Sequence, residues 1–208
     1  MTSTSSRPLA GVLLVGLLAG CGSAGGDGPG PSSAGGGDEP ITPRALAAVV
    51  AEYAGEPSAA GRATDLEELG SGLGAGVDFR YADQGVAGSY LLSVGVGRGF
   101  EEFAGGCDTW FDQAASGCAE TADGLVAWEE ATPEEDPGVV YVLVSKGRTQ
   151  VLLFSSGPPI TEDPRRLDLP VSVRDMMAIA ADPRVDVTTS QAAIEAGRDL
   201  AFWSDSPN

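Results

Sequence analysis

The chain has 208 residues, no histidine, and 12 basic against 30 acidic residues, which gives a formal net charge of −18 at pH 7. Such a chain offers no basic surface to neutralise phosphates, which excludes nucleic-acid binding and disfavours adsorption to anionic lipid headgroups. The absence of histidine excludes Ser-His-Asp and Cys-His catalysis and histidine-ligated metal centres. The composition therefore favours a cationic or neutral partner.

The first 20 residues have the three parts of a secretory signal. Arg7 provides the positive charge, the segment from Pro8 to Leu18 is apolar, and small residues follow it. The apolar part has about a dozen residues, whereas a membrane-spanning helix needs roughly 20, so we do not expect a permanent transmembrane helix. The rest of the sequence has no stretch long and apolar enough to span a membrane.

The run Leu18-Ala19-Gly20-Cys21 ends this signal with a leucine, two small residues and a cysteine. It resembles the lipobox of bacterial lipoprotein precursors. The resemblance implies cleavage before Cys21 and a thioether-linked diacylglycerol on its sulfur, and two acyl chains anchor a protein where one binds only marginally. The mature chain is then expected at the cell membrane, on the extracytoplasmic face. Ordinary secretion, with cleavage and release, is the alternative.

Residues 21–40 are rich in Gly, Ser and Pro and contain almost no apolar side chains. Such a segment cannot offset the entropy cost of its own ordering, so we predict a flexible tether. Residues 41–208 are of ordinary size for one globular domain and are numerous enough to bury a hydrophobic core. The predicted organisation is therefore a lipoprotein signal peptide (1–20), a tether (21–40) and a single domain (41–208).

The domain is predicted to begin with a helix. Thr42-Pro43 is a typical start, because Thr is a favoured N-cap and Pro a favoured first helical residue. Apolar residues follow at helical spacing as far as Tyr53, and Gly55 ends the helix. The Gly- and Ala-rich stretch from Gly55 to Gly76 is predicted to be mostly loop, with one helical turn near residues 65–69.

Runs of β-branched and aromatic residues bounded by Gly and Pro predict strands at 77–81, 90–96, 125–128, 139–144 and 150–154. Turns rather than helices join these runs, which favours an antiparallel sheet. Ser172 with Asp175 then predicts the start of one helix, and Thr188 with Gln191 the start of another. The predicted fold class is α+β: an antiparallel sheet of about five strands with one N-terminal helix and two C-terminal helices.

Cys21 is assigned to the lipid, which leaves Cys107 and Cys118 as an even pair in an oxidising compartment. We predict a disulfide between them that closes a loop of about a dozen residues and stabilises the fold by roughly 3 kcal/mol. The alternative is a redox-active or metal-binding pair. It is weaker because the spacing is wider than CxxC and no histidine completes a zinc site.

The stretch from Gly99 to Ser145 contains 11 acidic residues and no Lys or Arg. Three interpretations are compatible with it: a solvated acidic surface, a docking face for a cationic partner, or a catalytic or calcium-binding role. No DxDxDG-type spacing supports calcium. For the docking face, the candidate partner-binding residues are Glu129, Glu130, Glu134 and Glu135.

No motif in the sequence predicts a catalytic residue, a metal site or a cofactor. The favoured function is that of a membrane-anchored extracytoplasmic lipoprotein, which acts as a non-catalytic binding or accessory module for a basic or membrane-embedded protein partner. One alternative is a carrier of an apolar small molecule or lipid, because layers of sheet and helix can enclose a pocket. The other is a carboxylate-dependent extracytoplasmic hydrolase, which needs two carboxyl groups roughly 5–9.5 Å apart in a cleft.

Overall fold

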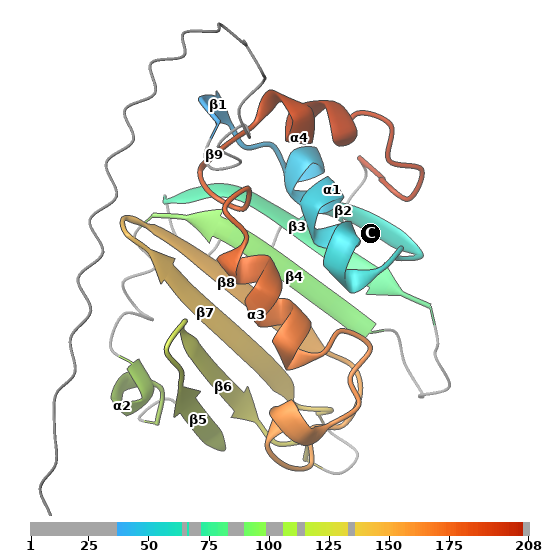
Figure 1. Cartoon of the computed structure of the whole chain (residues 1–208). Coiled ribbons are helices and arrows are strands. Elements are labelled where there is room, and N and C mark those ends of the chain that lie inside the picture. The colour runs from blue at the N-terminus through green and yellow to red at the C-terminus, as the bar shows by residue number, and fades with distance from the viewer. Residues whose placement is uncertain are drawn as a thin grey trace, which may run out of the picture. The chain divides into compact units, whose positions relative to one another are not determined.

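A seven-stranded antiparallel sheet with helices across one face forms the body of the domain (Figure 1). The computed structural model describes residues 37–63, 66, 72–82, 90–98, 106–111, 115–132 and 136–205. These ranges belong to one compact unit, residues 33–208. The predicted signal peptide, Cys21 and most of the predicted tether lie outside the described residues, as does most of the helical turn expected near residues 65–69.

The strands of the sheet follow the order β2-β3-β4-β8-β7-β6-β5, and every neighbouring pair is antiparallel. They are β2 (Ala59–Arg62), β3 (Leu73–Tyr81), β4 (Tyr90–Gly97), β5 (Gly117–Glu120), β6 (Leu125–Glu129), β7 (Val139–Lys146) and β8 (Thr149–Ser156). The prediction of an antiparallel sheet is confirmed, but the expected number of five strands is wrong. The two missed strands, β2 and β5, are the short edges, and their Gly- and Ala-rich sequences have little β propensity of their own.

The helices begin where side-chain caps are available. The helices are α1 (Pro43–Ala54), α2 (Gly106–Phe111), α3 (Val173–Ala181) and α4 (Gln191–Ala196), with a short 3₁₀ turn η3 (Pro164–Arg166). As predicted, Thr42 caps α1, its Oγ1 accepting from the backbone N–H of Ala45 at 3.1 Å, and Ser172 caps α3. Ser190, rather than the predicted Thr188, caps α4. Thr188 belongs instead to β9 (Thr188–Thr189), which pairs with β1 (Glu39–Pro40). The prediction also lacked α2.

Helices α1 and α3 lie across one face of the sheet, and the main core lies between the two layers (Figure 1). Alternate residues of the central strands point toward the helices, as the two-residue repeat of a strand requires. Those that are fully buried there include Val77, Phe79, Leu92, Val94, Val140, Val142, Val151 and Leu153. From the helices, Leu46 of α1 and Met176 of α3 meet them. Continuous apolar sequence in the central strands therefore reflects a sheet that is covered on both faces.

A smaller core covers the opposite face, which we call the second face. It is made of Ala63, Leu66, Leu125, Ala127, Leu143 and Leu152, with Cys107 and Cys118 packed against it. Gly95 leaves room for Leu66, because a Cβ at this glycine would lie 3.1 Å from the Leu66 Cδ1 atom. Within the described part of the chain, no helix has both the length and the apolar composition needed to cross a membrane.

Candidate functional site

The four predicted partner-binding glutamates do not form one described group. Glu129 ends β6 and is half-buried on the second face, where its carboxylate lies beside the hydroxyl of Tyr141. Burial raises the pKa of Tyr141 to about 12, and the negative charge of Glu129 adds to this effect. Glu130 follows as an exposed residue, and its backbone N–H donates to Ser116 Oγ at 2.8 Å. Glu134 and Glu135 lie outside the described residues.

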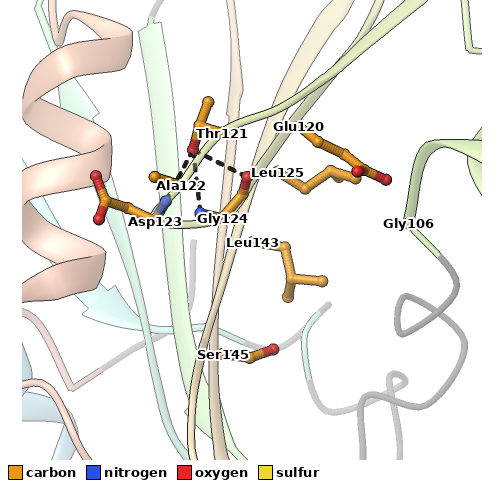
Figure 2. A pocket seen from close by; sticks show the side chains of 9 residues that line it. All are labelled: Gly106, Glu120, Thr121, Ala122, Asp123, Gly124, Leu125, Leu143 and Ser145. Atoms are coloured by element: carbon orange, nitrogen blue, oxygen red, sulfur yellow. Dashed lines mark hydrogen bonds between the residues drawn. The ribbon is translucent and has the colours of Figure 1, made fainter.

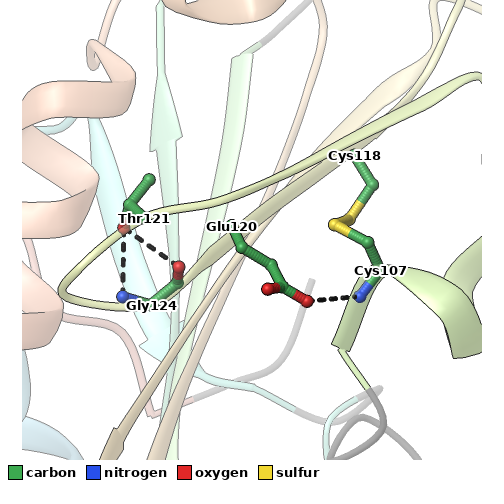
Figure 3. The surroundings of a disulfide bond; sticks show 5 residues. All are labelled: Cys107, Cys118, Glu120, Thr121 and Gly124. Carbon is green, nitrogen blue, oxygen red and sulfur yellow. Dashed lines mark hydrogen bonds between the residues drawn. A yellow bond between two sulfur atoms is a disulfide. The ribbon is translucent and has the colours of Figure 1, made fainter.

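The cysteine pair joins α2 to the edge strand β5 (Figure 3). Cys107 and Cys118 form a disulfide, and their Cα atoms are 5.6 Å apart, within the usual range for such a crosslink. Both side chains are half-buried against the second-face core. The crosslink therefore holds a helix of one and a half turns against a four-residue strand, two elements that are too short to be stable alone.

Glu120, two residues after Cys118, points toward the same face of the sheet because side chains alternate along a strand. Its Oε1 atom accepts a hydrogen bond from the backbone N–H of Cys107 at 3.2 Å (Figure 3). Gly106, with a φ of 67°, makes this approach possible, since a Cβ there would lie 2.6 Å from the same oxygen. The carboxylate of Glu120 is thus held at the start of α2 in two ways. It accepts a hydrogen bond from Cys107, and its backbone lies in β5 two residues after Cys118.

An open pocket of about 340 Å³ lies beside this carboxylate (Figure 2). Glu120, Leu125, Leu143 and Ser145 line it from neighbouring strands, Gly106 lines it from α2, and the turn of residues 121–124 completes its wall. The register places Glu120 opposite Leu125 and Leu125 opposite Leu143, so one row of side chains across three strands forms this wall. The pocket therefore combines an apolar surface with one carboxylate and one hydroxyl.

Thr121 organises the turn between β5 and β6. Its Oγ1 donates to the carbonyl oxygen of Gly124 at 2.9 Å and accepts from the backbone N–H of Gly124 at 3.1 Å (Figure 2). The side chains of Glu120 and Asp123 lie on opposite sides of this turn in Figure 2. Only Glu120 is directed toward Gly106, so the two carboxylates do not form a catalytic pair in this arrangement.

The pocket has a negative electrostatic character, because none of its lining residues is basic. The nearest cation along the chain is Lys146, which follows Ser145 at the end of β7. Its Nζ donates to the carbonyl oxygens of Asp182 (2.9 Å) and Val185, so the ammonium group lies on the helix-covered face of the sheet. Burial lowers the pKa of Lys146. No group of three or more His, Cys, Asp or Glu side chains suited to a metal ion occurs among the described residues.

Glu120 was not among the site residues predicted from the sequence. The signal that could have identified it is its spacing from Cys118: two residues apart in a strand places both on one face, beside the helix that the disulfide brings there. That inference needed strand β5, which the sequence pattern alone did not predict. No family model, no curated protein and no solved structure matches this chain.

Proposed function

We propose that this protein is a non-catalytic binding module that receives a basic protein partner on its acidic end. The acidic end consists of α2, β5, the turn of residues 121–124, β6 and residues 130–132 and 136. The observation that carries the proposal is the open pocket at this end, which has a carboxylate in its wall and no basic residue among the described residues that line it. A lipid on Cys21 would hold the module at the outer face of the membrane, where it meets such a partner.

The charges of the acidic end support an external partner. Its exposed carboxylates belong to Asp108, Glu120, Asp123, Glu130 and Asp136. None of them forms a salt bridge with a described Lys or Arg, since the described salt bridges involve only Glu52, Asp163, Asp182 and Asp205 as acids. Uncompensated charge of one sign at one end of the sheet attracts an oppositely charged protein over distance and speeds its association.

Reversing charge at the acidic end tests the partner. We expect the triple variant Asp108→Lys, Asp123→Lys, Glu130→Lys to lose most of the protein that photo-crosslinks to the full-length chain in intact cells. The matched control is Glu56→Lys, Glu162→Lys, Glu195→Lys, which makes the same change in net charge at exposed positions outside the acidic end. Equal recovery of the crosslinked partner from both triple variants would contradict the proposal.

The anchor is tested separately. Metabolic labelling with an alkyne-bearing fatty acid should mark the wild-type chain, and the Cys21→Ser variant should lose both the label and its place in the membrane fraction. The resemblance of Leu18-Ala19-Gly20-Cys21 to a lipobox supports this expectation. An unlabelled wild-type chain in the culture medium would instead indicate ordinary secretion.

A further inference from the structure

The pocket beside Glu120 has the chemistry of a receptor for one long cationic side chain. Leu125 and Leu143 are buried residues that provide apolar surface, while Glu120 is exposed and negatively charged. An aliphatic stem that ends in a positive group satisfies both parts, because such side chains bury their methylenes and keep the charge at a polar contact. At about 340 Å³, the space lies near the lower limit for small-ligand pockets, which suits one side chain better than a large ligand.

The carboxylate of Glu120 is positioned before any ligand arrives. Its Oε1 already accepts from the N–H of Cys107, and Cys107 is fixed to β5 through Cys118. No described residue donates a hydrogen bond to Oε2, so this oxygen is available to a ligand. A preorganised acceptor costs little conformational entropy when it binds, which increases the affinity that one contact provides.

Arginine fits this pocket better than lysine. The guanidinium group is planar and weakly hydrated, so it leaves water for a partly apolar site more readily than an ammonium group does. It also carries five donors in a planar fork, so it can pair with Glu120 and still donate to water at the open side of the pocket. A lysine ammonium would keep more of its hydration and gain less from the leucine surface.

We propose that an arginine side chain of the protein partner inserts into this pocket and pairs with Glu120, while its stem packs on Leu125. This inference rests on the proposed function and names its recognition element. The disulfide then has a functional consequence besides stability: it holds the start of α2 where the Glu120 carboxylate faces the pocket.

The test uses the full-length chain and N-acetyl-arginine-N-methylamide as the probe, with chemical-shift changes in the resonances of residues 120–125 and 143 as the readout. We expect saturable changes at millimolar probe concentrations, weaker changes with the lysine analogue, and none with the uncharged, nearly isosteric citrulline analogue. The Glu120→Gln variant should weaken arginine binding by roughly fivefold, the upper limit for a solvent-accessible ion pair. It keeps an oxygen that can accept from Cys107, so the fold is retained. Glu56→Gln, the matched control, should leave binding unchanged.

Three results would overturn the inference: no saturable change, equal binding of the citrulline analogue, or full affinity in Glu120→Gln. Butylguanidinium tests whether the pocket takes a protein side chain or a free small molecule. If it takes a side chain, N-acetyl-arginine-N-methylamide should bind at least as tightly as butylguanidinium. Tighter binding of butylguanidinium would reassign the pocket to a small molecule. If charge reversal abolishes partner crosslinking while every arginine probe fails, the proposed function stands and the arginine contact is wrong.

Discussion

Two tyrosines show how the setting of a single hydroxyl group decides its contribution to stability. The Tyr53 hydroxyl donates to Asp182 Oδ2 at 2.7 Å, which links α1 to the loop after α3. The Tyr81 hydroxyl is buried, and no described residue serves as its hydrogen-bond partner. Burial raises the pKa of Tyr81. A hydroxyl group that is buried without a partner destabilises the fold, whereas one that exchanges water for a hydrogen bond within the protein does not.

We therefore predict opposite effects for the same chemical change. Tyr53→Phe should lower the free energy of unfolding by about 1 kcal/mol, because a hydrogen bond to a carboxylate is lost. Tyr81→Phe should leave it unchanged or raise it by up to about 1 kcal/mol, because an unpaired buried hydroxyl is removed. Urea unfolding of the two variants and the wild type measures both. A larger loss for Tyr81→Phe than for Tyr53→Phe would contradict this interpretation of the Tyr81 hydroxyl.

Asp182 makes stability depend on pH. Burial acts to raise its pKa, but hydrogen bonds from Arg184 and Tyr53 outweigh this effect, so the pKa is lower in the folded chain than in the unfolded one. A carboxyl group with a lowered folded-state pKa contributes stability above its unfolded-state pKa of about 3.9, and that contribution is lost as pH falls through the lower folded-state pKa. The difference in unfolding free energy between wild type and Asp182→Asn should therefore be constant at neutral pH and shrink below pH ~4. A difference that grows as the pH falls would contradict this prediction and would mean that folding raises the pKa of Asp182.

At the scale of elements, the disulfide holds together two short elements of the second face, α2 and β5. Cys107 and Cys118 are separated by 11 positions in the chain, which on the loop-entropy model corresponds to roughly 3 kcal/mol. We predict that the Cys107→Ser, Cys118→Ser double variant is less stable by about this amount in denaturant unfolding. Hydrogen exchange should show faster opening of α2 and β5, while the amides of β3, β4 and β8 keep their relative protection. Uniform loss of protection across the sheet would mean that the crosslink stabilises the whole domain rather than one edge.

Elements with strong local signals could be predicted from the sequence. The cap at Thr42 and the helical spacing after it identified α1, and the β-branched runs identified the five inner or longer strands. β5 could not be predicted because its residues, GCAE, have no strand pattern. It forms because β6 offers a partner, and because the Trp128 ring covers Gly117, where a Cβ would lie 2.1 Å from a ring carbon. The site was missed for the same reason, since Glu120 acquires its position from β5.

At the scale of the whole molecule, one of the two edges of the sheet has a cover of its own. The outer edge of β2 is covered by the C-terminal segment: Ala60 donates to the carbonyl of Phe202 and accepts from Ser204, both at 2.8 Å. Asp205 secures this segment through hydrogen bonds from Arg44 and Trp203. A strand edge covered in this way cannot pair with another molecule.

Removing residues 201–208 should therefore open β2 to intermolecular pairing. We predict that the truncated chain has a lower unfolding free energy, because Phe202 no longer packs near Phe79, and forms concentration-dependent oligomers in light scattering. The milder Arg44→Ala variant, which loses its contacts to Asp205 and the Trp203 ring, should remain monomeric with a small loss of stability. A truncated chain that stays monomeric at all concentrations would show that the edge needs no cover.

The pairing of β1 with β9 gives the domain a defined response to mechanical force. In a chain held through its N-terminal segment, tension enters the described structure at β1, where only two residue pairs, Glu39 with Thr189 and Pro40 with Thr188, oppose it. Once these pairs have separated, the force acts on the hydrogen bond from the Ile41 N–H to the Val187 carbonyl and then on the capped start of α1. A pull on the N-terminal segment would extend these few contacts first, so the chain would lengthen at one corner of the domain before the sheet and the pocket beside Glu120 unfold.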